Sequence, residues 1–261
     1  MINQSEAALQ EQLIKEHLKS LDAAEKNFIP FVRHVWPEFI SGYHHKKIAK
    51  KFEDIKEGKI KRLIVNMPPR HTKSEFASFL FPSWLVGNNP KLKIIQTTHN
   101  TELAVRFGRK MKHLIDSQIY QQVFDEVAIS ADSKAAGRWE TNKGGEYFAA
   151  GVGSSITGRG ADLLIIDDPH SEQDALSETA FDNAYEWYTS GPRQRLQPGG
   201  AIVIVMTRWG VKDLTGRLID AQAKEPKADQ WEVIEFPAIL PSQKPIWPDR
   251  CDIYSLTATR A

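Results

Sequence analysis

The sequence predicts an α/β protein with a mostly parallel sheet flanked by helices. Apolar runs typical of buried parallel strands occur at residues 63–65, 163–166 and 201–206. Segments with helical periodicity separate these runs, so strand and helix alternate along most of the chain. Because parallel strands need crossover connections, this alternation indicates a sheet that is covered on both faces.

The predicted elements begin with an amphipathic helix over residues 5–27, in which Leu9, Leu13, Leu18 and Leu21 recur near helical spacing. We expect this helix to pack over the domain rather than to act as a partner-binding arm. A second helix is predicted over residues 44–57, and Gly58 ends it.

The rest of the chain continues the pattern. Strands are predicted at 63–65, 92–97, 146–150, 163–167, 201–206 and 231–236, and helices at 75–86, 101–116, 177–189 and 212–224. Residues 98–100 are expected to cap the helix over 101–116. Pro82 lies inside the helix over 75–86 and is expected to kink it.

One loop lies between the first predicted strand and the helix that begins at residue 75. Its sequence is Met67-Pro68-Pro69-Arg70-His71-Thr72-Lys73-Ser74. A loop with Lys-Ser at a helix start can bind a nucleoside triphosphate. Its backbone N–H groups and the lysine bind the phosphates, and the hydroxyl binds Mg²⁺. The usual spacing has glycine at positions 67 and 72, so this loop alone is equally compatible with an ordinary helix start.

Two further strand ends carry polar residues. The run over 163–166 ends in Asp167 and Asp168, and the run over 201–206 ends in Thr207-Arg208-Trp209. One acid can hold the water shell of Mg²⁺ while the other orients or deprotonates an attacking water. Since the ends of parallel strands meet at one edge of a sheet, we expect Lys73, both acids and Thr207 to converge there.

These motifs, with Asp213-Leu214, resemble the ATPase domain of large terminase subunits from tailed double-stranded-DNA bacteriophages. The resemblance covers residues 44–237 and implies a P-loop NTPase fold of the additional-strand type. A helical lead-in over 1–43 and a proline-rich linker over 238–261 would flank this domain. Past Pro237 only Asp249 and Asp252 could serve a nuclease, so we expect an isolated ATPase portion without nuclease activity.

The family uses ATP and Mg²⁺ to drive double-stranded DNA into a procapsid. The resemblance therefore implies non-specific DNA binding, a portal or procapsid and a small terminase subunit as partners, a ring of subunits on the portal, and the host-cell cytoplasm as location. Two alternatives remain open: a helicase-like or DNA-repair ATPase, and a non-hydrolysing nucleotide-binding assembly module. Thr72, where the family has glycine, and Asp168, where related motors often have glutamate, keep the second alternative open.

The resemblance also implies residue roles. The phosphates would be bound by Pro69, Arg70, His71, Thr72, Lys73, Ser74 and Glu75. Mg²⁺ would be held by Ser74 and Asp167, and water would be activated by Asp168 or, as the alternative base, Glu172. Arg70 would contact the γ-phosphate and Thr207 would report its loss.

Arg159 lies in a glycine-rich loop over residues 151–160, which we expect near the catalytic edge. It is interpreted either as a surface residue in a turn or as an arginine finger that reaches a neighbouring subunit's nucleotide. Trp209 is expected to pack rather than to touch a ligand.

Histidines are candidates for several roles. His44 or His45 could lie beside an adenine, although two exposed histidines are the favoured interpretation. His71 and His170 lack partners at metal-ligand spacing, so hydrogen bonding to solvent or loops is expected instead.

Composition sets broad limits. The formal net charge of the 261-residue chain is +1, so no global field attracts DNA. Lys46, Lys47, Lys50 and Lys51 are expected to form a solvated face rather than a DNA contact. The single cysteine, Cys251, excludes an internal disulfide and a cysteine-based zinc site, and no apolar run approaches the ~20 residues of a membrane span. We expect a soluble, intracellular protein.

Overall fold

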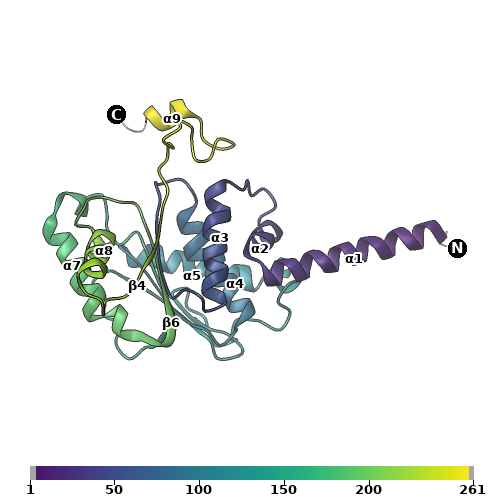
Figure 1. Ribbon diagram of the computed structural model, residues 1–261. Coiled ribbons are helices and arrows are strands. Elements are labelled where there is room, and N and C mark those ends of the chain that lie inside the picture. Colours follow the sequence, from purple (N-terminus) through teal and green to yellow (C-terminus); the bar gives the residue numbers. More distant parts are fainter. Residues whose placement is uncertain (1–3, 259–261) are drawn as a thin grey trace.

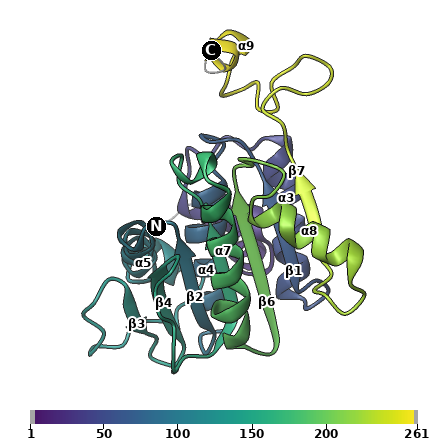
Figure 2. The same cartoon turned by 90° about the vertical axis from the view of Figure 1, so that its left-hand side faces the viewer.

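The computed structural model describes residues 4–258, which form a seven-stranded sheet flanked by helices (Figures 1 and 2). The strand order is β3-β4-β2-β5-β6-β1-β7, and every described strand pair is parallel except β3–β4. This confirms the predicted α/β class with a mostly parallel sheet and N-terminal helices. Residues 1–3 and 259–261, at the ends of the predicted lead-in and linker, lie outside the described residues, and the domain boundaries stay predictions.

The predicted strands lie within two residues of their expected bounds, except that β6 begins five residues before the expected start. They are β1 (Arg62–Asn66), β2 (Lys93–Thr98), β3 (Arg138–Glu140), β4 (Glu146–Gly151), β5 (Ala161–Asp167), β6 (Leu196–Met206) and β7 (Glu232–Glu235). The edge strand β3 was not predicted, because its three residues are too few for an alternating pattern to be recognised in the sequence. The strand β6 lies between β1 and β5 and pairs with both, which brings the ends of these strands together.

The helices also agree with most predictions. They are α1 (Gln4–Lys26), α2 (Phe28–Val35), α3 (Tyr43–Lys56), α4 (Phe81–Asn88), α5 (Thr101–Ile115), α6 (Gln118–Gln121), α7 (Glu178–Ser190), α8 (Leu214–Lys224) and α9 (Ile253–Ala258). The short helices α2, α6 and α9 were not predicted. The side chain of Asn100 accepts a hydrogen bond from the Glu102 N–H and caps α5, as predicted.

The helix predicted over 75–86 is a π-helical segment, Glu75–Leu80, that continues directly into α4, and the kink expected at Pro82 stays a prediction. In this segment the Phe81 N–H bonds the carbonyl of Phe76, five residues before it. Proline lacks an N–H and crowds the carbonyl four residues before it, so a wider turn accommodates it. The helix that follows the phosphate-loop candidate therefore starts irregularly.

The core has two layers, one on each face of the sheet. On one face, α2, α3 and α4 contribute aromatic side chains such as Phe28, Phe52 and Phe81, which pack with Trp84 of α4. On the other face, Tyr188 of α7 and α8 side chains cover the strands, and Figure 2 shows α7 and α8 lying on this face. Burial on both faces explains why the central strands read as continuous apolar runs.

The prediction that α1 packs over the domain is wrong for most of its length. Leu9, Leu13, Ile14 and Leu18 are each more than half exposed, and Figure 1 shows α1 (purple) extending away from the sheet. The helix meets the body near its C-terminal end, where Ala24 is buried and its carbonyl accepts a hydrogen bond from Trp84 Nε1. Amphipathic spacing thus indicated a helix correctly, but it did not reveal what the apolar face contacts.

Candidate active site

The strands β1, β5 and β6 end at one edge of the sheet, and the predicted site residues follow those ends. Asn66 pairs with Met206, and Asp167 pairs with Val205, so the loop after β1, the acids after β5 and Thr207 after β6 are neighbours. The structure therefore brings Lys73, both acids and Thr207 together as expected. The roles expected for these residues stay predictions.

The Lys73 ammonium forms an ion pair with Asp168, with 2.8 Å between Lys73 Nζ and Asp168 Oδ2. The Lys73 side chain is 7% exposed, so salt in the solvent screens this pair much less than a surface pair. The other carboxylate oxygen of Asp168 accepts a hydrogen bond of 2.8 Å from the Thr207 N–H. Each carboxylate oxygen of Asp168 therefore has one partner. The backbone of Asp168 has a positive φ of 42°, in the left-handed region.

The Asp167 carboxylate is buried and accepts hydrogen bonds from two serines, one at the N-cap of the π-helical segment Glu75–Leu80 and one inside that segment. Ser74 Oγ donates to Oδ1 at 2.9 Å and Ser78 Oγ donates to Oδ2 at 2.8 Å. Burial raises the pKa of Asp167 to about 7, and the neighbouring Asp168 charge adds to the rise, while Ser78, Lys73 and Ser74 oppose it. A cation that approaches Asp167 would favour its charged form.

The loop between β1 and the helix contains two non-glycine residues in the left-handed region. Arg70 has φ 63° and Thr72 has φ 65°, where glycine is the usual residue. Pro69 and Arg70 are exposed, and within residues 4–258 the structure records no hydrogen bond or ion pair of the Arg70 side chain. Thr72 is more constrained, because its hydroxyl bonds both His45 and the His71 carbonyl.

The expectation that His44 and His45 are exposed is wrong, because both side chains are fully buried. Their rings lie 3.8 Å apart and pack against Trp247 from the C-terminal segment. Burial lowers the pKa of His44 to about 4 and, with the nearby His44 charge, that of His45 to about 2. Both rings are therefore neutral at neutral pH. The covering residue lies some two hundred positions away in the sequence, so local pattern could not reveal the burial.

His71 and His170 form loop hydrogen bonds, as predicted. His71 Nδ1 donates to the Pro69 carbonyl at 2.8 Å, and His170 Nε2 accepts from the Leu214 N–H at 3.0 Å. Burial lowers the pKa of His170, which keeps it in the neutral form that can accept this bond.

The residues after β6 connect the loop, the acid and α8. Thr207 Oγ1 donates a long hydrogen bond of 3.4 Å to the Met67 carbonyl, so Thr207 touches both the loop and Asp168. Arg208 Nε bonds the buried carboxylate of Asp213 at 2.9 Å, and Asp213 caps α8. Trp209 is partly buried against the second core layer, as expected for a packing residue.

Within residues 4–258 the structure records no side-chain contact of Glu75 or Glu172 with the acid pair. Glu75 forms an ion pair with Lys110 of α5, so its carboxylate is already engaged. Glu172 is exposed, and within residues 4–258 no hydrogen bond or ion pair of its side chain is recorded. Of the two candidate bases, Asp168 is the one that contacts Lys73.

Arg159 does not lie at the catalytic edge. The loop over 151–160 starts there, but it returns across the sheet to begin β5 at the opposite edge, as a connection between parallel strands must. The six residue steps from Ala161 to Asp167 span roughly 20 Å. Arg159 stacks on Phe148, 4.1 Å from the ring centre, and lies 3.8 Å from a Glu146 oxygen. The expected position near the catalytic edge is therefore wrong for Arg159, and a role in a neighbouring subunit stays a prediction.

The sequence interpretation missed Ser78 as a site residue, and it considered His45 only as a possible neighbour of an adenine. Ser78 lies four positions after Ser74, so helical spacing could have placed both hydroxyls on one face toward Asp167. His45 had no local signal, because its partner Thr72 is far along the chain.

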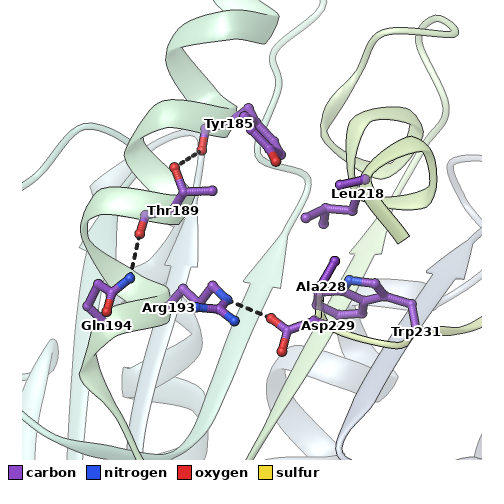
Figure 3. A pocket seen from close by; sticks show the side chains of 9 residues that line it. Tyr185, Thr189, Arg193, Gln194, Leu218, Ala228, Asp229 and Trp231 are labelled. Atoms are coloured by element: carbon purple, nitrogen blue, oxygen red, sulfur yellow. Dashed lines mark hydrogen bonds and ion pairs between the residues drawn. The ribbon is translucent and has the colours of Figure 1, made fainter. Parts of the chain in front are cut away.

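A separate hollow of about 210 Å³ lies between α7 and α8 (Figure 3). Its lining includes Arg193, whose Nε bonds Asp229 at 2.7 Å, and Asp229 also pairs with Arg62. The Asp229 carboxylate is thus shared by two guanidinium groups of the same chain. The hollow contains none of the residues that converge on Asp167, and we assign it no ligand.

No protein-family model matches this chain, and no curated protein matches it. No helix within residues 4–258 is long and apolar enough to cross a membrane. Within the same residues, no group of three or more His, Cys, Asp or Glu side chains is arranged to hold a metal ion. The oxygen donors of Ser74 and Asp167 nevertheless fit Mg²⁺, which proteins commonly bind through one or two carboxylates together with substrate phosphates.

Proposed function

We propose that this protein is an ATP-hydrolysing P-loop motor domain of the DNA-packaging type found in large terminase subunits. The observation that carries the proposal is the meeting of Lys73 and Ser74, after β1, with the paired acids after β5. The strand β6 between β1 and β5 fits the additional-strand type of P-loop fold. Together these features supply an ammonium group for the phosphates, a hydroxyl and two carboxylates at the carboxyl ends of neighbouring strands.

The binding step follows from the ion pair of Lys73. The loop backbone and Lys73 would bind the phosphates, so Lys73 must exchange its Asp168 partner for phosphate oxygens. Ser74 and Asp167 are the residues that would hold Mg²⁺, which when bound neutralises charge on the phosphate oxygens.

When Lys73 exchanges Asp168 for the phosphates, Asp168 also becomes available as the base. When Lys73 turns to the phosphates, Oδ2 of Asp168 loses its partner while Oδ1 stays bonded to the Thr207 N–H. The free oxygen can then accept a proton from a water that attacks the γ-phosphate. Thr207, which also bonds the Met67 carbonyl, could pass the state of the site to the strand β6.

The coupling to DNA rests on the resemblance of the motifs. Transport of double-stranded DNA into a procapsid, partnership with a portal and a small terminase subunit, a ring of subunits and a place in the host-cell cytoplasm are all part of this proposal. The basic face of α3 offers limited support for DNA contact, since Lys50 and Lys51 are paired with Asp54 and Glu232. A helicase-like ATPase and a non-hydrolysing assembly module are the competing functions.

Phosphate release measured with and without DNA and procapsid tests the proposal. Lys73→Ala should abolish turnover and weaken ATP binding, whereas Lys91→Ala, at an exposed site, should behave as the parent. Asp168→Asn should bind Mg²⁺-ATP without hydrolysing it. Unchanged turnover in Lys73→Ala would contradict the site, and loss of turnover in Glu172→Gln but not in Asp168→Asn would move the base to Glu172.

The effects of DNA and of procapsid on phosphate release distinguish the three candidate functions. Stimulation by procapsid supports the packaging motor, and stimulation by DNA without any effect of procapsid supports a helicase-like enzyme. Tight ATP binding with no phosphate release under any condition supports the assembly module.

A further inference from the structure

The phosphate-loop candidate contains a backbone conformation that its sequence disfavours. Thr72, directly before Lys73, has φ 65°, in the left-handed region where an L-residue is strained by roughly 1–2 kcal/mol. Threonine is β-branched, which makes it a poorer choice there than asparagine or aspartate. Something in the tertiary structure must hold Thr72 in this conformation.

The contacts of Thr72 identify what holds it. Its hydroxyl donates to the His71 carbonyl at 2.6 Å and accepts a hydrogen bond from His45 Nε2, also at 2.6 Å. The direction of the second bond is determined by the other ring nitrogen. His45 Nδ1 accepts from the Gly42 N–H at 2.8 Å, so the proton of the neutral ring is on Nε2.

His45 is itself held rigidly. Its ring is fully buried among Phe39, Phe76 and Trp247, with ring centres 4.7–4.8 Å away. Burial lowers its pKa, so the ring stays neutral and keeps one donor and one acceptor in place. The bond between α3 and the loop therefore joins Thr72 to the packed core.

We propose that His45 is a positioning residue that holds Thr72 in its left-handed conformation, so that the loop N–H groups and Lys73 are oriented for a triphosphate. This inference rests on the proposed nucleotide-binding function. His45 does not itself reach the substrate in this arrangement, because its ring nitrogens are used by Gly42 and Thr72. It supplies through a hydrogen bond what a glycine at position 72 would supply through its lack of a Cβ.

The proposal predicts that the need for His45 depends on the residue at position 72. The proteins to compare are the parent, His45→Leu, Thr72→Gly and the double variant, each assayed for ATP affinity, KM and kcat. His45→Leu should weaken ATP binding about tenfold, which corresponds to roughly 1.4 kcal/mol. In the Thr72→Gly background the same substitution should change affinity less than twofold. The loss should appear in KM rather than in kcat, because His45 does not touch the reacting atoms.

Two further variants serve as controls. His44→Leu removes a neighbouring buried histidine that makes no hydrogen bond to the loop hydroxyl, so its effect on affinity should be equal in both backgrounds. His45→Gln, which can still donate to Thr72, should recover part of the affinity that His45→Leu loses. An equal loss for His45→Leu in both backgrounds would overturn the proposal, because His45 would then act through general packing.

The urea midpoints of the four proteins separate this inference from the proposed function. A parent that does not bind ATP refutes the function, and with it the nucleotide part of the inference. The midpoints still decide whether His45 holds Thr72. Non-additive shifts, with His45→Leu costing less in the Thr72→Gly background, support the contact, and additive shifts overturn it.

Discussion

Acid should destabilise this protein through the buried pair His44 and His45, and the effect can be isolated at His44. Burial, followed by the nearby His71 charge, lowers the pKa of His44 to about 4 from an ordinary 6.5. Neither ring nitrogen of His44 makes a hydrogen bond of good geometry. A weak interaction with the His71 backbone favours the protonated ring and offsets part of the lowering of the pKa. Water, by contrast, solvates the charged ring freely in the unfolded chain.

The sign and size of the effect follow from linkage. Between pH 6.5 and 4 the unfolded chain binds a proton at this position and the folded protein does not, so stability is complete above pH 6.5 and falls as the pH is lowered. From pH 7.5 to 5.0 the loss at His44 is about 2 kcal/mol, and His45 adds about the same. Asp167, whose pKa burial raises, acts in the opposite direction over this range, so the total change in the parent is smaller than the sum.

The measurement is the free energy of unfolding by urea at pH 7.5 and 5.0, for the parent and His44→Leu. The variant should lose about 2 kcal/mol less between the two pH values than the parent does, whatever its stability at pH 7.5. His113→Leu, on an exposed face of α5, is the matched control for the loss of a histidine that lies outside the core. Equal losses in the parent and His44→Leu would refute the argument, because His44 would then be protonated as easily in the fold as outside it.

Three other predictions can be tested with the same methods. Ser78→Ala removes a hydrogen bond to the buried Asp167 carboxylate, so it should reduce the free energy of unfolding by about 1.5–3 kcal/mol at pH 8 and slow ATP turnover. Ser83→Ala in α4 should cost less, because that hydroxyl bonds only the backbone carbonyl four residues before it. Arg159→Ala should bind ATP yet not hydrolyse it, and mixing it with inactive Lys73→Ala should restore some turnover. Full activity of Arg159→Ala without any rescue would leave Arg159 as a packing partner of its own chain. Leu18→Ser, on the exposed face of α1, should change the free energy of unfolding by less than about 0.5 kcal/mol, and a larger loss would mean that this face is covered in solution.

Much of the fold could be predicted because the signals are local. The runs that form β1, β5 and β6 are apolar over successive residues, since both faces of these strands are buried. The cap residue Asn100 and the loop before Lys73 were also recognisable from adjacent residues. The sequence by itself therefore determined the α/β class, most element positions, and which strand ends carry a lysine, two acids and a threonine.

The tertiary structure decided what those residues contact. The bond from His45 to Thr72 joins positions 27 residues apart, and the bond from Ser78 to Asp167 joins positions 89 apart. Tertiary structure also places β6 between β1 and β5 and leaves the apolar face of α1 exposed. Arg159 lies against Phe148 of β4, away from the strand ends that carry the two acids. Periodicity reports which side of an element is apolar, whereas burial, ion pairing and strand order depend on segments that meet only when the chain folds.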